Sequence, residues 1–172
     1  MVRKIFNRNF LYRLLKMKTV GYPFPQETKY KKLKTGGRYG HKNFPLSKYA
    51  IDFAIPLGTQ IIASEDGIVI AGNFNSYSYI HPKHIKDIPI KTAKWLAEQT
   101  TNCAILQHSD GTYSEYCHLK REKTKLKSRQ KVKKGDLLGH TGRSGIMSQP
   151  HLHYNRVKEI NGKLQSIPTY FE

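Results

Sequence analysis

The sequence predicts a mainly β domain with an antiparallel, sandwich-like sheet core and one short helix. Short runs rich in Ile, Val, Phe, Tyr and Thr recur between turns built from Gly, Pro, Asp and Ser. Several runs alternate apolar and polar side chains, which is typical of strands that bury one face. The spacing of the turns favours antiparallel connections. We therefore expect one folded domain over residues 21–172, preceded by a basic tail over residues 1–20.

The first clear strand is predicted over residues 51–55, where Ile51, Phe53 and Ile55 should face a core and Asp52 the opposite side. A turn with Pro and Gly over residues 56–59 ends it. The later strands are expected over residues 60–63, 68–71, 102–107 and 112–119, followed by a last strand that holds His151 and His153.

Residues 73–101 interrupt this series of strands. The segment starts as a loop, and Pro82 and Pro89 break its middle. Residues 92–99 favour a short helix with Thr92 near its N-terminal cap, because good helix formers follow a residue type that caps well. We expect this inserted loop and helix to shape a groove wall or to contact a partner.

The chain is strongly basic. Among its 172 residues, 30 Lys and Arg stand against 12 Asp and Glu, which gives a formal net charge of +18. Such a charge favours polyanionic partners: nucleic acid, anionic membranes, or a cell wall rich in carboxylates and phosphates. Basic side chains also occupy every second position from 123 to 133. This pattern predicts either a solvated edge strand that resists aggregation or a track for an anionic polymer.

Targeting signals are not readable in this sequence. No apolar run reaches the roughly 18–20 residues that a membrane-spanning helix needs. The first residues are basic, as in a signal peptide, but neither an apolar middle nor a small-residue cleavage site follows them. The route of export therefore stays open.

The two cysteines, Cys103 and Cys117, flank a predicted hairpin. With a two-residue turn at Asp110 and Gly111, Cys103 would lie opposite His118, and the two thiols would face opposite sides of the sheet. A three-residue loop would change the register and allow a disulfide. We predict the two-residue turn and two free thiols.

The chemistry of the chain centres on His151-Leu152-His153. In a strand both histidines point to the same side, so one can bind a metal while the other reaches the same substrate. A catalytic zinc has three protein ligands and an open position for water, and a carboxylate with histidines supplies suitable ligands. Asp52 and one histidine of the pair would supply two ligands. His41 is the best third, because it lies in a short loop that leads into the Asp52 strand.

From about Tyr22 to Val157, the sequence resembles the lysostaphin-like zinc endopeptidases, the LytM-type peptidoglycan hydrolases. The matching motifs, in chain order, are Gly40-His41, Tyr49-Ala50-Ile51-Asp52-Phe53, Pro56-Leu57-Gly58-Thr59, Ala63-Ser64-Glu65-Asp66-Gly67-Ile68-Val69, Asn102, His108-Ser109-Asp110-Gly111-Thr112, Tyr116-Cys117-His118-Leu119, Val132-Lys133-Lys134-Gly135-Asp136, Gly139-His140-Thr141-Gly142 and His151-Leu152-His153-Tyr154.

The resemblance implies a role for each matched residue. His41, Asp52 and His153 would bind one zinc ion per chain. His118 and His151 would flank the open position and transfer protons or hydrogen-bond the oxyanion. We expect two further residues, His140 and Tyr154, to support this site from behind or to touch the substrate.

One position departs from the family pattern. Many members place the first histidine four residues before the aspartate, where this chain has Lys48. Some relatives with a similar strand supply this ligand from an upstream loop, as His41 would here. Without His41 as a ligand the site would be degenerate, as in relatives that bind or regulate without cutting.

The resemblance thus implies a zinc-dependent endopeptidase that hydrolyses peptide stems or cross-bridges of bacterial peptidoglycan, in the cell envelope or outside the cell. The basic charge would hold such an enzyme on anionic wall polymers. One alternative is a non-catalytic module of the same fold that binds the wall or activates another hydrolase. A second alternative, a nucleic-acid binder, rests on charge alone and is supported by no recognition motif.

Overall fold

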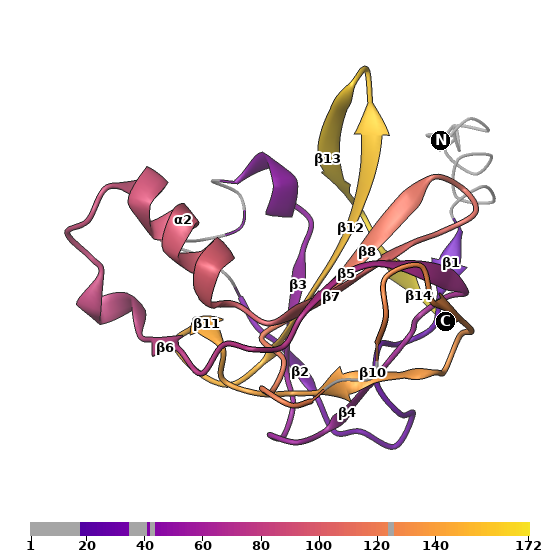
Figure 1. Ribbon diagram of the computed structural model, residues 1–172, viewed down its shortest axis with the longest axis horizontal. Helices are drawn as coiled ribbons and strands as arrows, with labels where there is room; N and C mark the ends of the chain where they lie inside the picture. The colour runs from indigo at the N-terminus through magenta and orange to yellow at the C-terminus, as the bar shows by residue number, and fades with distance from the viewer. Residues whose placement is uncertain (1–17, 35–40, 42–43, 124–125) are drawn as a thin grey trace, which may run out of the picture.

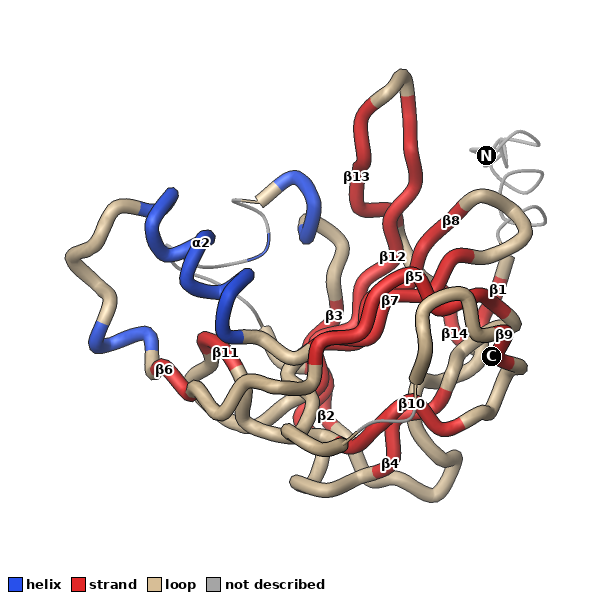
Figure 2. Tube along the Cα trace, viewed as in Figure 1, coloured by secondary structure: helices blue, strands red, loops and turns tan. Residues whose placement is uncertain are grey.

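The computed structural model describes residues 18–34, 41, 44–123 and 126–172. This part of the chain is mainly β, and every pairing in its large sheet is antiparallel, as the sequence predicts (Figure 1 and Figure 2). The strands are β1 Thr19–Val20, β2 Lys31–Lys32, β3 Ile51–Ala54, β4 Gln60–Ile62, β5 Gly67–Asn73, β6 Tyr79–Ile80, β7 Cys103–Gln107, β8 Thr112–Cys117, β9 Lys131–Val132, β10 Leu137–His140, β11 Gly145–Ile146, β12 Leu152–Ile160, β13 Lys163–Ile167 and β14 Tyr170–Phe171. The helical elements are the 3₁₀ helices η2 Pro45–Ser47 and η3 Pro82–His84 and the α-helix α2 Ile90–Thr100.

An eight-stranded sheet forms the centre of the molecule. Its strands follow the order β2-β3-β12-β8-β7-β5-β9, and β13 pairs with β12. Because β12 lies between β3 and β8, His153 is the direct partner of Asp52 on one side and of Cys117 on the other. Cys103 of β7 is in turn the partner of Cys117. One row across four strands therefore holds Asp52, His153, Cys117 and Cys103.

The hydrophobic core lies on one face of this sheet. Its fully buried side chains from the large sheet include Phe53, Leu106, Tyr116, Leu152 and Tyr154. The antiparallel β4–β10 pair adds Ile61 and Leu138 to the same cluster. Burial of one such leucine, isoleucine or phenylalanine side chain stabilises the fold by about 1.5–3 kcal/mol. Since neighbours along a strand point to opposite faces, Asp52 and His153 are directed away from this core.

The β7–β8 hairpin differs from its predicted form. Gln107 pairs with Tyr113, and the His108 N–H donates to the Thr112 carbonyl (2.9 Å), so three residues rather than two form the loop. Gly111 is left-handed there (φ 76°), as is common at the end of a three-residue hairpin loop.

This register places Cys103 opposite Cys117, with 4.2 Å between their Cα atoms, and the two residues form a disulfide. The prediction of two free thiols is wrong because the additional loop residue shifts the pairing by one position. A shift by one residue turns a strand's side chains to the other face, and here it brings both thiols to the same side.

The inserted segment contains β6, η3 and α2. The strand β6 pairs in parallel with β11, so the segment is joined to the part of the chain just before His151. The helix α2 begins at Ile90, two residues earlier than the predicted start at Thr92. It begins there because the Pro89 carbonyl already accepts the first helical hydrogen bond, from the N–H of Ala93 (3.0 Å).

Most of the expected basic tail lies outside the described residues. Its last two residues, Thr19 and Val20, form β1 and pair in parallel with Tyr170 and Phe171 of β14. In the alternating basic stretch, residues 124 and 125 are not described, and only Lys131–Val132 forms a strand in the remainder. Arg129 has a positive φ of 66°, which interrupts an extended conformation. Within the described ranges, no helix is long and apolar enough to span a membrane.

Candidate active site

Three side chains of metal-binding type converge on the face of the sheet opposite the core. His153 Nδ1 lies 3.0 Å from Asp52 Oδ1, and His41 Nε2 lies 3.3 Å from Asp52 Oδ2. The ligand atoms of all three residues lie within 4.8 Å of one another. Tetrahedral ligands that each lie about 2.0–2.1 Å from a zinc ion are separated by about 3.3–3.4 Å. The separations in this cluster are therefore close to those that a metal ion requires.

The sheet itself positions two of these residues. Asp52 and His153 are cross-strand partners on β3 and β12, and their neighbours Phe53, Leu152 and Tyr154 are buried in the core. A slip of either strand by one residue would bury the carboxylate and the imidazole among apolar side chains, so the hydrophobic pattern defines this register.

His41 reaches the cluster from the loop before β3. Its Nδ1–H donates to the Ala50 carbonyl at 3.0 Å, and in the neutral imidazole this leaves a lone pair on Nε2. That lone pair faces an oxygen of the Asp52 carboxylate. A nitrogen and a carboxylate oxygen at this separation need a cation between them. In the metal-free protein a proton can take that place as a hydrogen bond from His41 to Asp52, and a metal ion can replace this proton, so the donor set fits a metal ion.

The Asp52 carboxylate controls the electrostatics of the cluster. Burial alone would raise the pKa of Asp52, but hydrogen bonds from His153 and His41 outweigh burial and hold the pKa well below its usual range. Burial alone would likewise lower the pKa of His153, whereas its bond to Asp52 raises the pKa above the ordinary value. In the absence of a metal, the Asp52 carboxylate is thus ionised and accepts a hydrogen bond from His153 Nδ1–H.

Two further histidines lie beside this cluster, each with Nδ1 bound to a backbone carbonyl. His118 Nδ1–H donates to Ser144 O (2.8 Å), and His151 Nδ1–H donates to Gln149 O (2.8 Å). Both rings therefore carry a lone pair on Nε2 when neutral. Their centroids are 4.6 Å apart, and His151 Nε2 lies 3.6 Å from Asp52 Oδ2.

Burial keeps these two imidazoles neutral. Burial, together with the nearby His151 and His153, lowers the pKa of His118 to about 3. Burial also lowers the pKa of His151, although the Asp52 carboxylate opposes it. A neutral imidazole can accept a proton or bind a developing charge after protonation, which are the roles of a general base and an oxyanion partner.

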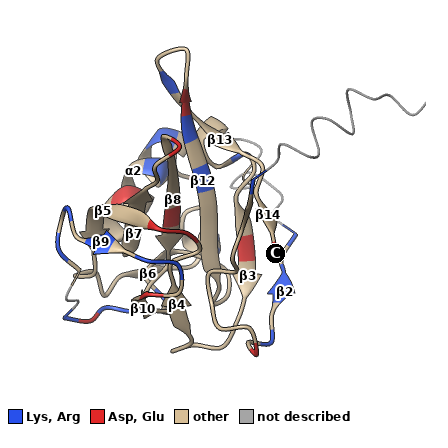
Figure 3. Cartoon of the chain, turned by 90° about the vertical axis from the view of Figure 1, so that its right-hand side faces the viewer, with Lys and Arg blue, Asp and Glu red and all other residues tan. Residues whose placement is uncertain are grey.

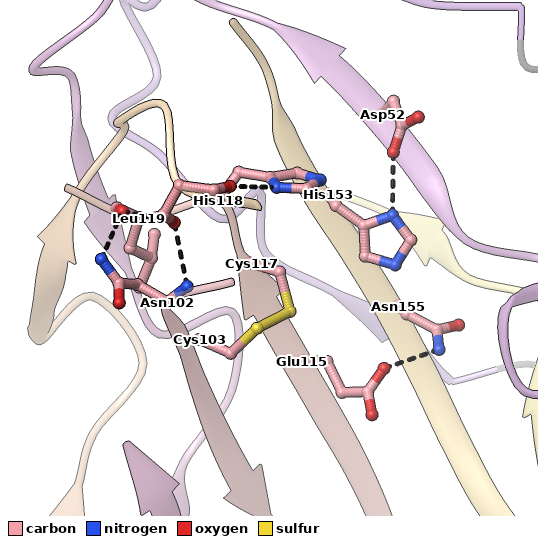
Figure 4. The surroundings of a disulfide bond; sticks show 10 residues. Asp52, Asn102, Cys103, Glu115, Cys117, His118, Leu119, His153 and Asn155 are labelled. Atoms are coloured by element: carbon pink, nitrogen blue, oxygen red, sulfur yellow. Dashed lines mark hydrogen bonds and ion pairs between the residues drawn. A yellow bond between two sulfur atoms is a disulfide. The ribbon is translucent and has the colours of Figure 1, made fainter. Parts of the chain in front are cut away.

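The structure thus brings together all five residues that the sequence singles out, namely His41, Asp52, His118, His151 and His153. Figure 4 shows Asp52 facing His153 across two strands, with the Cys103–Cys117 disulfide next to them in the same row. Lys48, where the family resemblance led us to expect a histidine, is exposed, and its Nζ lies 5.1 Å from the centroid of the Tyr49 ring.

The two residues expected to support the site or to touch the substrate have different surroundings. His140 lies on β10, where its Nδ1 is 3.2 Å from Glu122 Oε1. Tyr154 is fully buried in the core, and its hydroxyl is 2.9 Å from Ser64 Oγ. The Tyr154 side chain thus points to the opposite face of β12 from its neighbour His153, into the core.

The sequence assigned no role in the site to three polar residues that lie near it, although Asn102 is among the matched family motifs. Ser144 supplies the carbonyl that binds His118, and its hydroxyl accepts from the Asn102 N–H. Asn155 follows His153 by two residues on β12, and both asparagines are completely buried. The period of two along β12 places Asn155 on the same face as His153, so the alternation of side chains could have indicated Asn155. Asn102 and Ser144 act through contacts between distant segments, for which the sequence offers no local pattern.

Comparison with protein families places most of the chain in one of them. The model of peptidase family M23 matches residues 47–165, which is more than half of the sequence. The match includes four of the five site residues and starts after His41.

Curated relatives share this region. The peptidoglycan DD-endopeptidase ShyA of Vibrio cholerae is 29% identical over 120 residues, which cover 68% of this chain and 22% of that protein. The glycyl-glycine endopeptidase ALE-1 of Staphylococcus capitis is 26% identical over 125 residues, which cover 69% of this chain and 28% of that protein. The chain thus spans less than a third of the length of these relatives.

Solved structures agree with this result. The catalytic domain of the prophage-encoded M23 protein EnpA from Enterococcus faecalis superposes with a TM-score of 0.54 at 25% identity, covering 86% of this chain and 93% of that domain. Lysostaphin from Staphylococcus simulans superposes with a TM-score of 0.51 at 26% identity, covering 80% of this chain and 47% of that chain. The chain belongs to peptidase family M23.

Proposed function

We propose that this chain is a zinc-dependent endopeptidase that hydrolyses peptide stems or cross-bridges of bacterial peptidoglycan. The observation that carries the proposal is the arrangement of His41, Asp52 and His153 as a compact donor set beside two oriented, neutral imidazoles. A structural metal site would not need two further imidazoles held in fixed orientation beside its donor set.

His41, Asp52 and His153 would hold the metal ion. When bound there, zinc supplies a Lewis acid that polarises a carbonyl and lowers the pKa of water. The carboxylate contributes the one negative charge of the donor set, and its deprotonated state at neutral pH follows from its lowered pKa.

His118 and His151 would act on the substrate. Each holds its Nδ1–H against a backbone carbonyl, so Nε2 can accept a proton from the attacking water and, once protonated, can donate to the oxyanion or the leaving amine. The paired backbone bonds fix both ring orientations before substrate arrives, which reduces the cost of ordering them during the reaction.

The name of one relative supports peptidoglycan as the substrate class, but the names of two relatives do not agree on one scissile bond. ShyA is a peptidoglycan DD-endopeptidase, whereas ALE-1 is a glycyl-glycine endopeptidase. These two names denote different peptide bonds. We therefore assign the substrate class and leave the bond to the fragment analysis below.

Two properties fit a protein that works in the cell envelope. The Cys103–Cys117 disulfide is typical of proteins that mature in an oxidising compartment. The net charge of +18 favours adhesion to anionic wall polymers, and Figure 3 shows Lys and Arg on the edge strands β2 and β9. Adhesion of this kind should weaken as salt concentration rises.

Purified sacculi of several wall types provide the test. The zinc-loaded full chain, a chelated sample and the His118→Ala variant are each incubated with them, and the released fragments are identified by mass. We expect peptide fragments from the zinc-loaded wild type alone. Binding to sacculi without release by the zinc-loaded wild type would instead support a non-catalytic wall-binding module.

A further inference from the structure

We propose that two buried asparagines, Asn102 and Asn155, are positioning residues that each hold one half of the site. Asn102 would hold the His118 imidazole, and Asn155 would hold the loop that presents His41. The inference rests on the roles proposed above for His118 and His41. It extends them by assigning each half of the site its own support.

Asn102 lies at the junction between the inserted segment and β7, and it is completely buried. Its Nδ2 donates to Ser76 O (3.0 Å) and to Leu119 O (3.2 Å), and its Oδ1 accepts from the Ser76 N–H (2.8 Å). Its backbone N–H donates to Ser144 Oγ (2.9 Å). One residue thus connects the start of the insertion with the segments that follow β8 and β10.

These contacts lead directly to His118. Ser144 Oγ donates to Leu119 O (2.9 Å), while Ser144 O accepts the proton of His118 Nδ1. The residue after His118, Leu119, donates its N–H to Asn102 O (3.1 Å). Both the carbonyl that orients the ring and the backbone next to the ring are therefore fastened to Asn102. Figure 4 shows Asn102 against Leu119.

The backbone of His118 needs such support. Its φ is +68°, a left-handed conformation that is strained for a residue with a Cβ. The strain is sustained by bonds on both sides, from Leu119 N–H to Asn102 O and from Gly142 N–H to His118 O (2.9 Å). Loss of the Asn102 side chain would remove the donor to Leu119 O and the bonds to Ser76 that fix Asn102 itself, and would let the ring leave the Ser144 carbonyl.

Asn155 lies on β12, two residues after His153 and on the same face, and it is also completely buried. Its Nδ2 donates to Leu46 O in η2 (2.7 Å) and to Glu115 Oε2 (2.8 Å). Its Oδ1 accepts from Ser166 Oγ (2.8 Å). Figure 4 shows Asn155 against Glu115.

The same group of residues fastens the His41 loop at a second point. Ser166 Oγ accepts from the N–H of Tyr49 (3.0 Å), so residues 46 and 49 are both tied to the β12–β13 hairpin. The next residue, Ala50, supplies the carbonyl that orients His41. His41 thus depends on Asn155 through a short piece of backbone that is held at both ends.

The test compares Asn102→Ala with Asn155→Ala in the full chain, using two readouts that need no turnover. Zinc affinity is measured by competition with a chromophoric chelator. The ring N–H protons of the histidines are followed by ¹H–¹⁵N NMR in the zinc-loaded protein. Outer partners of metal ligands typically contribute about 10–100-fold to metal affinity.

We expect Asn155→Ala to weaken zinc binding by about 10–100-fold while the His118 Nδ1–H signal keeps its position. Asn102→Ala should shift or broaden that signal and speed its exchange with solvent, with zinc affinity unchanged. The two residues are controls for each other, because both are fully buried amides with several hydrogen bonds.

A purely structural role would lower the stability of both variants and affect the two readouts alike, and that result would overturn the proposal. If either alanine variant does not fold, Ser144→Ala replaces Asn102→Ala and Ser166→Ala replaces Asn155→Ala, with the same expected separation. Failure to cleave sacculi would refute the proposed enzyme function but would leave this separation of readouts intact, so the two hypotheses fail independently.

Discussion

Asp52 and His153 are direct partners across β3 and β12, and a 3.0 Å contact joins Asp52 Oδ1 to His153 Nδ1. The pair stands in the same row as the Cys103–Cys117 disulfide, so four strands are tied together at the level of the proposed metal site. Rigid strands hold ligands more accurately than loops do, which favours this row as the fixed part of the site.

Replacement of Asp52 by Asn should abolish tight zinc binding while the fold persists. The amide keeps the shape of the carboxylate but removes the negative charge and half of the acceptor capacity. We expect zinc affinity to fall by more than about 100-fold, which is a larger loss than the removal of a residue that only supports a metal ligand would cause. The control is Asp66→Asn, which changes an exposed aspartate in a turn. Zinc affinity of Asp52→Asn equal to that of the control would contradict the assignment.

Zinc should stabilise the protein more as the pH rises. Burial alone would lower the pKa of His153, but the bond to Asp52 raises this pKa above the ordinary 6.5. At lower pH, zinc must therefore displace a proton from His153 before it can bind there. In the metal-free protein the raised pKa stabilises the fold fully below pH 6.5, and this contribution is lost as the pH rises through the raised value.

The measurement for this prediction is the increase in Tm on zinc addition between about pH 5.5 and 8. His118 stays neutral throughout this range, because burial and its histidine neighbours lower its pKa to about 3. We expect the increase to grow with pH. An increase that is constant or larger at the acidic end would argue against His153 as a ligand.

Loss of the disulfide should destabilise the domain by about 3 kcal/mol, the value for a closed loop of about 15 residues. The double variant Cys103→Ser with Cys117→Ser removes it without adding volume. Urea unfolding of this variant should match that of the reduced wild type, with a lower midpoint than the oxidised protein. Equal midpoints for oxidised and reduced wild type, together with two titratable thiols, would restore the original prediction of free cysteines.

Tyr154→Phe should affect stability and spare catalysis. The Tyr154 hydroxyl is bonded to Ser64 Oγ inside the core, and a buried hydrogen bond of this kind contributes about 1 kcal/mol. Unfolding in urea measures the loss, and fragment release from sacculi measures activity. A large drop in release at unchanged stability would mean that Tyr154 takes part in the reaction after all.

The alternation of side chains made half of the site predictable. A period of two places Ile51 and Phe53 toward the core and Asp52 away from it, and the same argument applies to Leu152 and His153. The structure keeps these assignments because a one-residue slip would exchange the buried and the polar face. The family motifs then indicated that strands distant in the sequence contribute to one site.

The rest of the site depends on features without a local signal. Two- and three-residue turns are both compatible with Asp110 and Gly111, and only the paired strands decide between them. Asn102 finds its partners at Ser76, Leu119 and Ser144, which lie in three separate segments. Such contacts become visible only when the chain is folded.

The number of zinc ions bound by the wild type and by His41→Ala tests the metal centre most directly. His41 lies before the region matched by the family, and its place is defined by the Ala50 carbonyl and by Asp52. Native mass spectrometry of the full chain after exposure to equimolar zinc should show one ion on the wild type and none on His41→Ala. A metal-free wild type, or a variant that still retains one ion, would contradict a centre built from His41, Asp52 and His153.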